Sequence, residues 1–496
     1  MNSPSKIEQF DVQAVNKDGA KKLFQASEKI YPKRVEGTFR QLKWGIMVLT
    51  LLVYYITPWL RWDRGEFAPD QAVLVDLANR RFYFFFIEIW PQEFFYVAGL
   101  LIMAGIGLFL VTSVWGRAWC GYACPQTIWV DLFLVVERFW EGDRNQRIKL
   151  DKAPWSLPKI TTKTMKYLSW VIISLATGGA WIFYFADAPT LAQSFIRFEA
   201  PAIAYSTVAI LASTTFVLGG FLRDQVCTYM CPWPRIQAAM LDEKSLVVTY
   251  NDFRGEPRTA HQKKALAAGE LVGDCIDCNK CVAVCPMGID IRDGQQLECI
   301  TCALCIDACD SVMAKTGKPK GLISYATLEE YKATKAGQKL KNTLPILFRP
   351  RTVLYSLIWC SIGLAMLYVL ATRSRLDVNV LHDRNPLVVQ LKNGAERNGY
   401  IVKILNMEPR PHKALFSFEG LEQAEMRIEG LEGEVIQNNT PYELDLKPDQ
   451  LRKLKVYITV PKQFLPPSSI DIRFTAAILE TNDRHETVST FHVKRK

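Results

Sequence analysis

The chain has 496 residues, a length that accommodates roughly three domains of about 150 residues. Apolar residues make up 49% of it and charged residues 22%, which excludes a disordered chain, and 13 cysteines are too few for a small secreted scaffold built on disulfides. The mean hydropathy of +0.03 averages long uncharged blocks with stretches rich in Lys and Arg, which excludes both an ordinary soluble enzyme and a membrane-only bundle. The net charge of +10 does not indicate nucleic-acid binding, because the basic residues flank apolar blocks, where they anchor a chain beside an anionic leaflet.

Five uncharged blocks are long enough to cross, or nearly cross, about 30 Å of hydrocarbon. They are residues 44–60, 94–115, 167–186, 200–222 and 352–372. The first 43 residues carry nine Lys or Arg and no apolar run, so no cleavable signal peptide is expected.

The basic residues of the short loops predict the orientation of these spans. Residues 1–43 hold nine Lys or Arg and residues 116–166 hold another nine, whereas residues 187–199 hold only Arg197. The positive-inside rule places the first two segments in the cytoplasm and the third outside. Residues 223–351 then form a large cytoplasmic insert, and residues 373–496 form a periplasmic domain.

The membrane half contains an internal repeat. The second span runs into GRAWCGYACPQTIW and the fourth into RDQVCTYMCPWPRI, so each ends in Cys-x-x-x-Cys-Pro with a Tyr in the middle. Pro suits the first position of a helix, so each second cysteine is expected at the entry to a short amphipathic helix at the interface. The four thiols expected to converge at the cytoplasmic membrane face are Cys120, Cys124, Cys227 and Cys231.

The chemistry of these four thiols stays open at this point. Close cysteines bind soft metals such as Cu(I), hold an iron–sulfur cluster or form a redox-active pair. A single cysteine at a membrane boundary is commonly a small apolar filler, but two matched pairs disfavour that interpretation. Cys360, alone in the fifth span, is predicted to serve packing.

Residues 271–313 of the insert contain two runs of four cysteines with the spacing Cys-x-x-Cys-x-x-Cys-x-x-x-Cys. In the two-cluster ferredoxin arrangement the last cysteine of each run ligates the other cluster, which assigns two [4Fe–4S] centres. The first has Cys275, Cys278, Cys281 and Cys309, and the second has Cys299, Cys302, Cys305 and Cys285. A zinc site or a disulfide framework fits this spacing less well. The first run is followed by a Pro, whereas the second is followed by Asp310, and this difference removes no ligand. The charged segments 242–270 and 315–344 are predicted to be linkers without a core.

From about residue 376 the apolar blocks give way to about seven short alternating runs separated by Gly, Asn, Asp and Pro, which predict an immunoglobulin-like β-sandwich. The segment has neither Cys nor Trp, so the prediction rests on strand spacing. Its histidines look like scattered surface or packing residues: His382, His412, His485 and His492. No histidine lies in a predicted span, which disfavours a membrane haem.

The order of these parts resembles the CcoG/FixG family, also called RdxA, which are accessory proteins for assembly of cbb-type cytochrome c oxidase. The resemblance covers nearly the whole chain and rests on WCGYACPQ, CTYMCPWP, the two ferredoxin runs and the strand-rich C-terminal domain. The cysteine motifs alone are also similar to membrane ferredoxins of the NapH and NosR kind, and the trailing β domain favours CcoG. The implied fold is a bundle of about five transmembrane helices with an inserted bacterial-type 2[4Fe–4S] ferredoxin domain and a C-terminal immunoglobulin-like sandwich.

The resemblance implies an inner-membrane protein that reduces Cu(II) to Cu(I) for the oxidase, with Cys120, Cys124, Cys227 and Cys231 as candidates for the copper or redox site. Its expected partners are membrane lipid, copper ion, copper-handling and oxidase-assembly proteins and an electron donor of unknown identity, without nucleic acid, and a homo-oligomer is left open. Two alternatives are a quinol-linked conduit to a protein partner and a non-catalytic assembly scaffold. A third cluster on the four membrane-edge thiols is a variant of the conduit.

Overall fold

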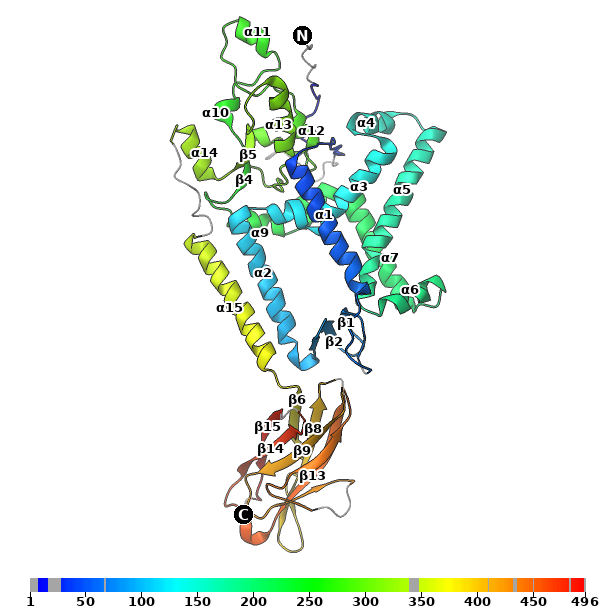
Figure 1. The fold of residues 1–496 in the computed structure, drawn as a ribbon, viewed down its shortest axis with the longest axis vertical. Helices are drawn as coiled ribbons and strands as arrows, with labels where there is room; N and C mark the ends of the chain where they lie inside the picture. The colour runs from blue at the N-terminus through cyan, green and yellow to red at the C-terminus, as the bar shows by residue number, and fades with distance from the viewer. Residues whose placement is uncertain are drawn as a thin grey trace. The chain divides into compact units, whose positions relative to one another are not determined.

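The computed structural model describes residues 8–16, 28–66, 68–338, 348–408, 410–430, 435–448, 450–480 and 483–494. Contacts divide the chain into two units, which Figure 1 traces from blue at the N-terminus to red at the C-terminus. The first unit comprises Met1–Leu60, Val73–Leu77 and Phe94–Leu364, and the second comprises Arg61–Ala72, Ala78–Glu93 and Ala365–Lys496.

Five helices in the described part of the chain are long and apolar enough to cross a membrane, the number that the sequence predicts. They are α1 (Thr38–Ile56), α2 (Phe95–Trp115), α5 (Leu157–Thr177), α7 (Ala202–Phe216) and α15 (Pro350–Thr372). Most of the apolar surface of α2 and α15 is exposed, as expected of helices that lipid covers. Cys360 on α15 is exposed as well, so the predicted packing role for this residue is wrong.

The predicted spans misplace the boundaries of helices α1 and α5. Helix α1 begins six residues before the apolar block, and α5 begins ten residues before it and ends at Thr177, followed by a 3-10 turn at Gly179–Tyr184. Charged residues of the first turns of α5 are paired rather than solvated: Lys163 contacts Glu141 and Asp151, and Lys166 contacts Glu141. Uncharged runs mark only the part of a helix that lies in hydrocarbon. The sequence therefore underestimates the length of a helix whose charged end residues are paired with opposite charges.

Shorter helices connect the spans in the first unit. They are α3 (Pro125–Glu141), α4 (Arg144–Lys152), α6 (Ala188–Ile196), α8 (Arg223–Gln225) and α9 (Trp233–Met240). Helix α3 has Pro125 at its first position and Cys124 as its N-cap, as the sequence predicts. In the second motif Pro232 is itself the N-cap of α9. Asp131 on α3 is buried; burial opposes its charge, but Lys43 and Arg40 of α1 hold the pKa of its carboxyl below the ordinary value, which ties α3 to α1.

The insert folds around a small sheet that the sequence did not predict. Strands β4 (Val247–Tyr250) and β5 (Ile323–Ala326) pair antiparallel, and both contribute side chains to an apolar core that also contains Cys275 and Cys281. The helices of the insert are α10 (Asp252–Gly255), α11 (Gln262–Ala267), α12 (Lys280–Val284), α13 (Leu304–Thr316) and α14 (Leu328–Lys335). The prediction that residues 242–270 and 315–344 lack a core is therefore wrong for β4 and β5; residues 339–344 lie outside the described residues.

The insert is fixed to the membrane bundle at two points. Helix α1 has no capping side chain of its own, and the backbone N–H groups of Phe39 and Arg40 instead donate to the Asp307 carboxylate of α13, at 3.2 and 2.8 Å. The negative charge satisfies two amides at a helix N-terminus. At the second point a Cβ on Gly121 would lie 2.7 Å from the carbonyl oxygen of Ile300 and 3.1 Å from the Cα of Cys302. Only a glycine permits this approach of the two backbones.

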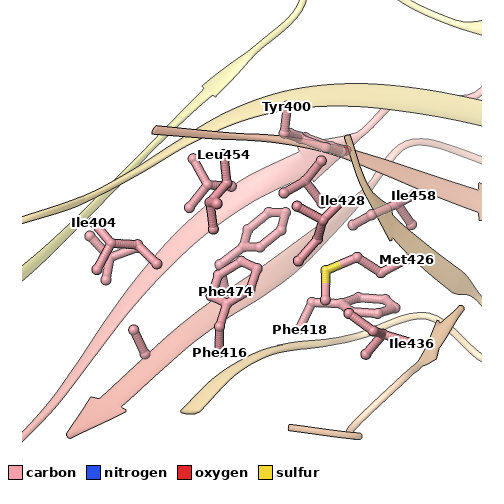
Figure 2. Close-up of a cluster of buried hydrophobic side chains, with 14 of the residues drawn as sticks. Tyr400, Ile404, Phe416, Phe418, Met426, Ile428, Ile436, Leu454, Ile458 and Phe474 are labelled. Carbon is pink, nitrogen blue, oxygen red and sulfur yellow. The ribbon is translucent and has the colours of Figure 1, made fainter. Parts of the chain in front are cut away.

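The second unit contains the predicted β-sandwich. One sheet has the order β11-β10-β13-β8-β6, with β7 paired to β8, and the other has the order β12-β9-β14-β15. The strands are β6 (Leu376–His382), β7 (Val389–Gln390), β8 (Glu396–Asn406), β9 (His412–Glu419), β10 (Glu425–Ile428), β11 (Ile436–Gln437), β12 (Tyr442–Leu446), β13 (Leu451–Val460), β14 (Ile470–Ile478) and β15 (Arg484–Phe491). Figure 2 shows the buried core, where the rings of Phe416 and Phe474 stack with centroids 6.0 Å apart.

Two details of this unit differ from the prediction. The described sandwich has ten strands rather than about seven, and β10 and β11, with four and two residues, are too short to show an alternating pattern. His382 and His492 are not scattered: their rings pack 4.9 Å apart. The strands that precede the sandwich are β1 (Val73–Asp76), β2 (Arg81–Phe84) and β3 (Ile87–Ile89), of which β2 and β3 form an antiparallel hairpin.

Gly121→Ala should loosen the insert from the membrane bundle. The added methyl meets main-chain atoms that cannot rotate away, so we expect a destabilisation of about 1–3 kcal/mol, measured as earlier proteolysis of the insert and a lower thermal midpoint. Gly45→Ala in α1 is the matched control, because a Cβ there meets nothing within 4 Å. Equal stability of the two variants would contradict the close approach.

Candidate iron–sulfur and thiol site

The two cysteine runs of the insert share one backbone conformation. Asp277 and Thr301, two residues after the first cysteine of each run, have φ of 47° and 55°, and Asn279 and Ala303, one residue after the second, have φ of 55° and 60°. Residues other than glycine rarely adopt this left-handed region of φ, and β-branched residues such as Thr301 adopt it least often. Its recurrence at matching positions shows that the sequence repeat is also a structural repeat.

Each of these turns leads into the helix that carries the third cysteine of its run. Asn279 is the N-cap of α12, and Ala303 is the N-cap of α13. The thiols fall mainly into two sets of electrostatic neighbours, each containing the fourth cysteine of the opposite run, and Cys305 of the second set also neighbours Cys281 of the first. One group is Cys275, Cys278, Cys281 and Cys309, and the other is Cys285, Cys299, Cys302 and Cys305.

The surroundings of both groups fit an iron–sulfur cluster. A cavity lined by the four cysteines of the second group and by Cys281 of the first has an otherwise apolar lining, which includes Met287 and Ile289. Burial raises the pKa of Cys285 to about 12 and that of Cys299 to about 11, and backbone N–H groups oppose these shifts, those of Met287 and Ile289 at Cys285 and that of Thr301 at Cys299. Buried thiols stay protonated until a metal replaces the proton, and amides directed at sulfur are part of how proteins hold such clusters.

The duplicated Cys-x-x-x-Cys-Pro motifs are also alike in structure. Each winds into a five-residue π-helical turn, Trp119–Ala123 in the first motif and Val226–Met230 in the second. In each, the N–H of the second cysteine donates to the carbonyl five residues earlier: Cys124 to Trp119 at 2.9 Å and Cys231 to Val226 at 2.8 Å. Such turns are rare, and they occur frequently at functional sites.

The structure brings the two motifs together. The thiol of Cys120 interacts electrostatically with those of Cys124 and Cys231, and Cys120 and Cys227 belong to one apolar cluster. We call Cys120, Cys124, Cys227 and Cys231 the thiol quartet. Within the described residues no group of three His, Cys, Asp or Glu side chains is close enough to hold a single metal ion, and this applies to the two ferredoxin groups as well as to the quartet.

The thiol quartet adjoins the second ferredoxin group. The apolar cluster that holds Cys120 and Cys227 also includes Cys285, Cys299 and Cys302. Tyr122, the tyrosine of the first motif, donates from its hydroxyl to the carbonyl of Cys302 at 3.3 Å. Its counterpart Tyr229 is exposed, and the second motif contacts the insert through Cys227.

Three residues near the quartet were missed by the sequence analysis. The thiol of Cys120 donates to Oε1 of fully buried Gln237 at 2.9 Å, and Nε2 of Gln237 donates to Thr112 at 3.1 Å. Burial raises the pKa of Cys120 to about 11, and the nearby Arg117 guanidinium opposes that shift. Tyr325 donates to the carbonyl of Thr301 at 2.6 Å. Nothing in the spacing singles out Gln237 or Tyr325, because each reaches the site from an element distant in sequence, whereas Arg117 lies three residues before Cys120.

Comparison with protein families confirms the predicted fold class. Residues 222–328 match a family described as a 4Fe-4S dicluster domain, and residues 97–141, which include Cys120 and Cys124, match one described as a 4Fe-4S binding domain. Residues 366–494 match an IG-like fold at the C-terminal of FixG, putative oxidoreductase.

Curated relatives resemble the chain over most of its length. Nitrogen fixation protein FixG of Rhizobium meliloti is 60% identical and covers 89% of this chain and 88% of its own. Proteins RdxB and RdxA of Cereibacter sphaeroides are 55% and 50% identical and cover 78% and 83% of this chain, and 81% and 86% of their own. A crystal structure of a FixG-related protein from Vibrio parahaemolyticus aligns with 25% of this chain and 100% of its own, with 18% identity and a TM-score of 0.21. The identity to FixG, RdxA and RdxB and the FixG-type C-terminal domain show that this membrane protein belongs to the CcoG/FixG/RdxA family of iron–sulfur electron-transfer proteins.

Proposed function

We propose that the protein reduces Cu(II) to Cu(I) at the thiol quartet and delivers the product toward assembly of cbb-type cytochrome c oxidase. The observation that carries this proposal is the packing of Cys120 and Cys227 in one apolar cluster with three cysteines of the second ferredoxin group. Reduction of Cu(II) needs one electron, and soft thiolates stabilise the Cu(I) that results. A source of single electrons and a soft binding site thus lie side by side.

The proposal assigns one [4Fe–4S] cluster to each ferredoxin cysteine group, with the crossed sets that the spacing predicts. When bound, such clusters supply one-electron transfer. The chain's own contribution is to enclose the sites in apolar side chains, to direct the N–H groups of Met287 and Ile289 at the Cys285 sulfur, and to hold Cys302 against Gly121. The contact at Gly121 keeps the second group adjacent to the quartet.

The residues around Cys120 are suited to exchanging a proton for a metal. A thiol must lose its proton to bind copper, and Arg117 favours the thiolate of Cys120 against the effect of burial. Gln237 accepts the Cys120 hydrogen and is itself held by its bond to Thr112. We assign Gln237 as a positioning residue that fixes the direction of this sulfur before copper arrives.

The proposed location is the inner membrane, with the N-terminus, the ferredoxin groups and the quartet on the cytoplasmic side and the sandwich in the periplasm. It is supported by the excess of Lys and Arg in residues 1–43 and 116–166. The sandwich then acts as a docking module for oxidase-assembly proteins. Copper would reach the quartet from the cytoplasmic side.

A second candidate is an electron conduit in which the quartet holds a third cluster and the acceptor is a protein. It is favoured by one observation, the match of residues 97–141, which contain only Cys120 and Cys124 of the predicted ligands, to a 4Fe-4S binding family. Two cysteines do not complete a cubane, so Cys227 and Cys231 would have to supply the rest. The two candidates differ in metal content and in their response to copper.

The anaerobically purified protein, reduced with dithionite and freed of excess reductant, should be reoxidised by Cu(II). We expect the visible absorbance of the oxidised clusters to return as a Cu(I)-specific chelator reports one Cu(I) formed for each electron released. Zn(II), which takes no electron, is the matched control and should leave the reduced state unchanged. Reduced clusters that persist in the presence of Cu(II) would overturn the copper proposal.

The double variant Cys120→Ser and Cys227→Ser distinguishes copper binding at the quartet from a third cluster held there. We expect reoxidation by Cu(II) to slow by about tenfold or more, while iron stays near eight atoms per chain, the content of two cubanes. Cys360→Ser, which alters an exposed cysteine of α15, is the control and should match the unaltered protein. A wild-type count near twelve that falls to about eight in the double variant would establish the third cluster instead.

Gln237→Leu should weaken copper binding without changing the iron content. The substitution keeps the volume but removes the acceptor for the Cys120 thiol, and loss of such a supporting partner lowers metal affinity by about 10- to 100-fold. Competition with a Cu(I) chelator measures the change. Gln237→Glu, which retains an acceptor, should recover most of the affinity; if it binds as poorly as Gln237→Leu, then Gln237 is not a positioning residue.

A further inference from the structure

The first unit contains a cavity of about 400 Å³ among helices α1, α3, α5 and α7, which Figure 1 shows grouped together. Its size falls in the range of small-molecule sites, which in helical bundles lie between the helices. The aromatic rings in its lining come from Tyr54, Trp129 and Trp181. Thr214, which also lines it, is exposed on α7, so the cavity reaches a surface that lipid covers.

The hydroxyls of this cavity have their hydrogens already used, and the side-chain N–H donors in its lining are the indoles of Trp129 and Trp181. Thr50 donates to the carbonyls of Ile46 and Met47, and Thr214 and Thr215 both donate to that of Leu211. Tyr54 donates to the carbonyl of Thr177 at 2.5 Å. These hydroxyls therefore offer only lone pairs to an occupant, and none of the described residues that line the cavity carries a charge. A fitting ligand is neutral, aromatic and a hydrogen-bond donor.

The cavity also reaches the first cysteine motif. Ala123 and Pro125, which flank Cys124 on either side, are part of its lining. Cys124 interacts with Cys120, and Cys120 packs with cysteines of the second ferredoxin group. A redox-active occupant would lie beside the thiol quartet and next to the electron-accepting part of the molecule.

We propose that this cavity binds the ring of an isoprenoid quinol, and that this quinol is the electron donor of the protein. A quinol is neutral and aromatic, donates through two hydroxyl groups and reaches its site through lipid. The hydroxyl oxygens of the lining can accept from the two O–H groups of a quinol, and the indole N–H groups of Trp129 and Trp181 can donate to its oxygens. The inference rests on the proposed electron-transfer function and adds its donor.

The reaction balances with the two predicted clusters. Oxidation of one quinol breaks two O–H bonds and gives one quinone, two protons and two electrons. The oxidised [4Fe–4S] clusters take one electron each, and the protons pass to water at the membrane surface. One quinol therefore reduces one fully oxidised chain, which afterwards reduces two Cu(II) ions.

The test uses the full chain, loaded with iron and oxidised, in nanodiscs made from quinone-free phospholipid. Decylubiquinol is the probe, its binding is followed by tryptophan quenching, and cluster reduction is followed by loss of visible absorbance. We expect saturable binding of decylubiquinol, accompanied by loss of the visible absorbance of the oxidised clusters. Binding without cluster reduction would overturn the assignment of this quinol as the electron donor.

Thr214→Phe and Ser213→Phe form the matched pair. Both residues are exposed on α7, but only Thr214 lines the cavity. We expect Thr214→Phe to weaken quinol binding and slow quinol-driven reduction by tenfold or more, and Ser213→Phe to behave as the unaltered protein. Iron content and bleaching by dithionite verify that each variant is folded and loaded.

The outcomes distinguish this inference from the proposed function. If Thr214→Phe binds and oxidises quinol as well as Ser213→Phe does, the cavity is not the donor site. Absence of saturable quinol binding to the unaltered protein would likewise overturn the inference, and would indicate that lipid acyl chains fill the cavity. Neither result bears on copper, because Cu(II) reoxidation of dithionite-reduced protein is measured without any quinol.

Discussion

The arrangement of redox groups depends on the close approach of two backbones at Gly121. The first cysteine motif of the membrane half lies against Ile300 and Cys302 of the insert with no room for a methyl group. This contact places the thiol quartet in the apolar cluster that holds part of the second ferredoxin group. Because electron transfer weakens steeply with distance, a looser fit would separate two sites whose individual structures were unchanged. The glycine thus serves the juxtaposition of the two motifs rather than either motif alone.

The same contact explains why charged groups are buried at this end of the bundle. Helix α1 lacks a capping side chain of its own, and Asp307 of α13 satisfies its first amides. Asp131 is held between Arg40 and Lys43. Breaking one partner of a buried ion pair leaves an uncompensated charge, so the insert and the bundle hold each other in a single geometry. The coupling extends from the ferredoxin helix through α1 to α3, which begins at the first cysteine motif.

The features that could be predicted from the sequence are those that local residue patterns determine. Five spans, the sandwich and the ferredoxin insert follow from apolar runs, alternation and cysteine spacing, and the comparisons confirm that fold class. Strands β4 and β5 were missed because 72 positions separate Tyr250 from Leu322 and each strand is too short to alternate. Gln237 was missed because its role comes from packing between helices. The ligand roles of the cysteines stay predictions, because their spacing indicates which thiols come together but does not identify the group that they bind.

A ferredoxin domain attached to membrane helices gains an advantage over a water-soluble one if a reactant reaches it through the lipid. The cavity beside Ala123 and Pro125 offers one answer, a route from lipid to the edge of the thiol quartet. Its hydroxyls donate to carbonyls within the helices, which fixes the polarity of the lining before any ligand arrives. The hydroxyl oxygens of this lining can accept from the O–H groups of a reduced carrier. Oxidation removes those O–H groups, so the contacts that hold the substrate to these hydroxyls are lost in the product.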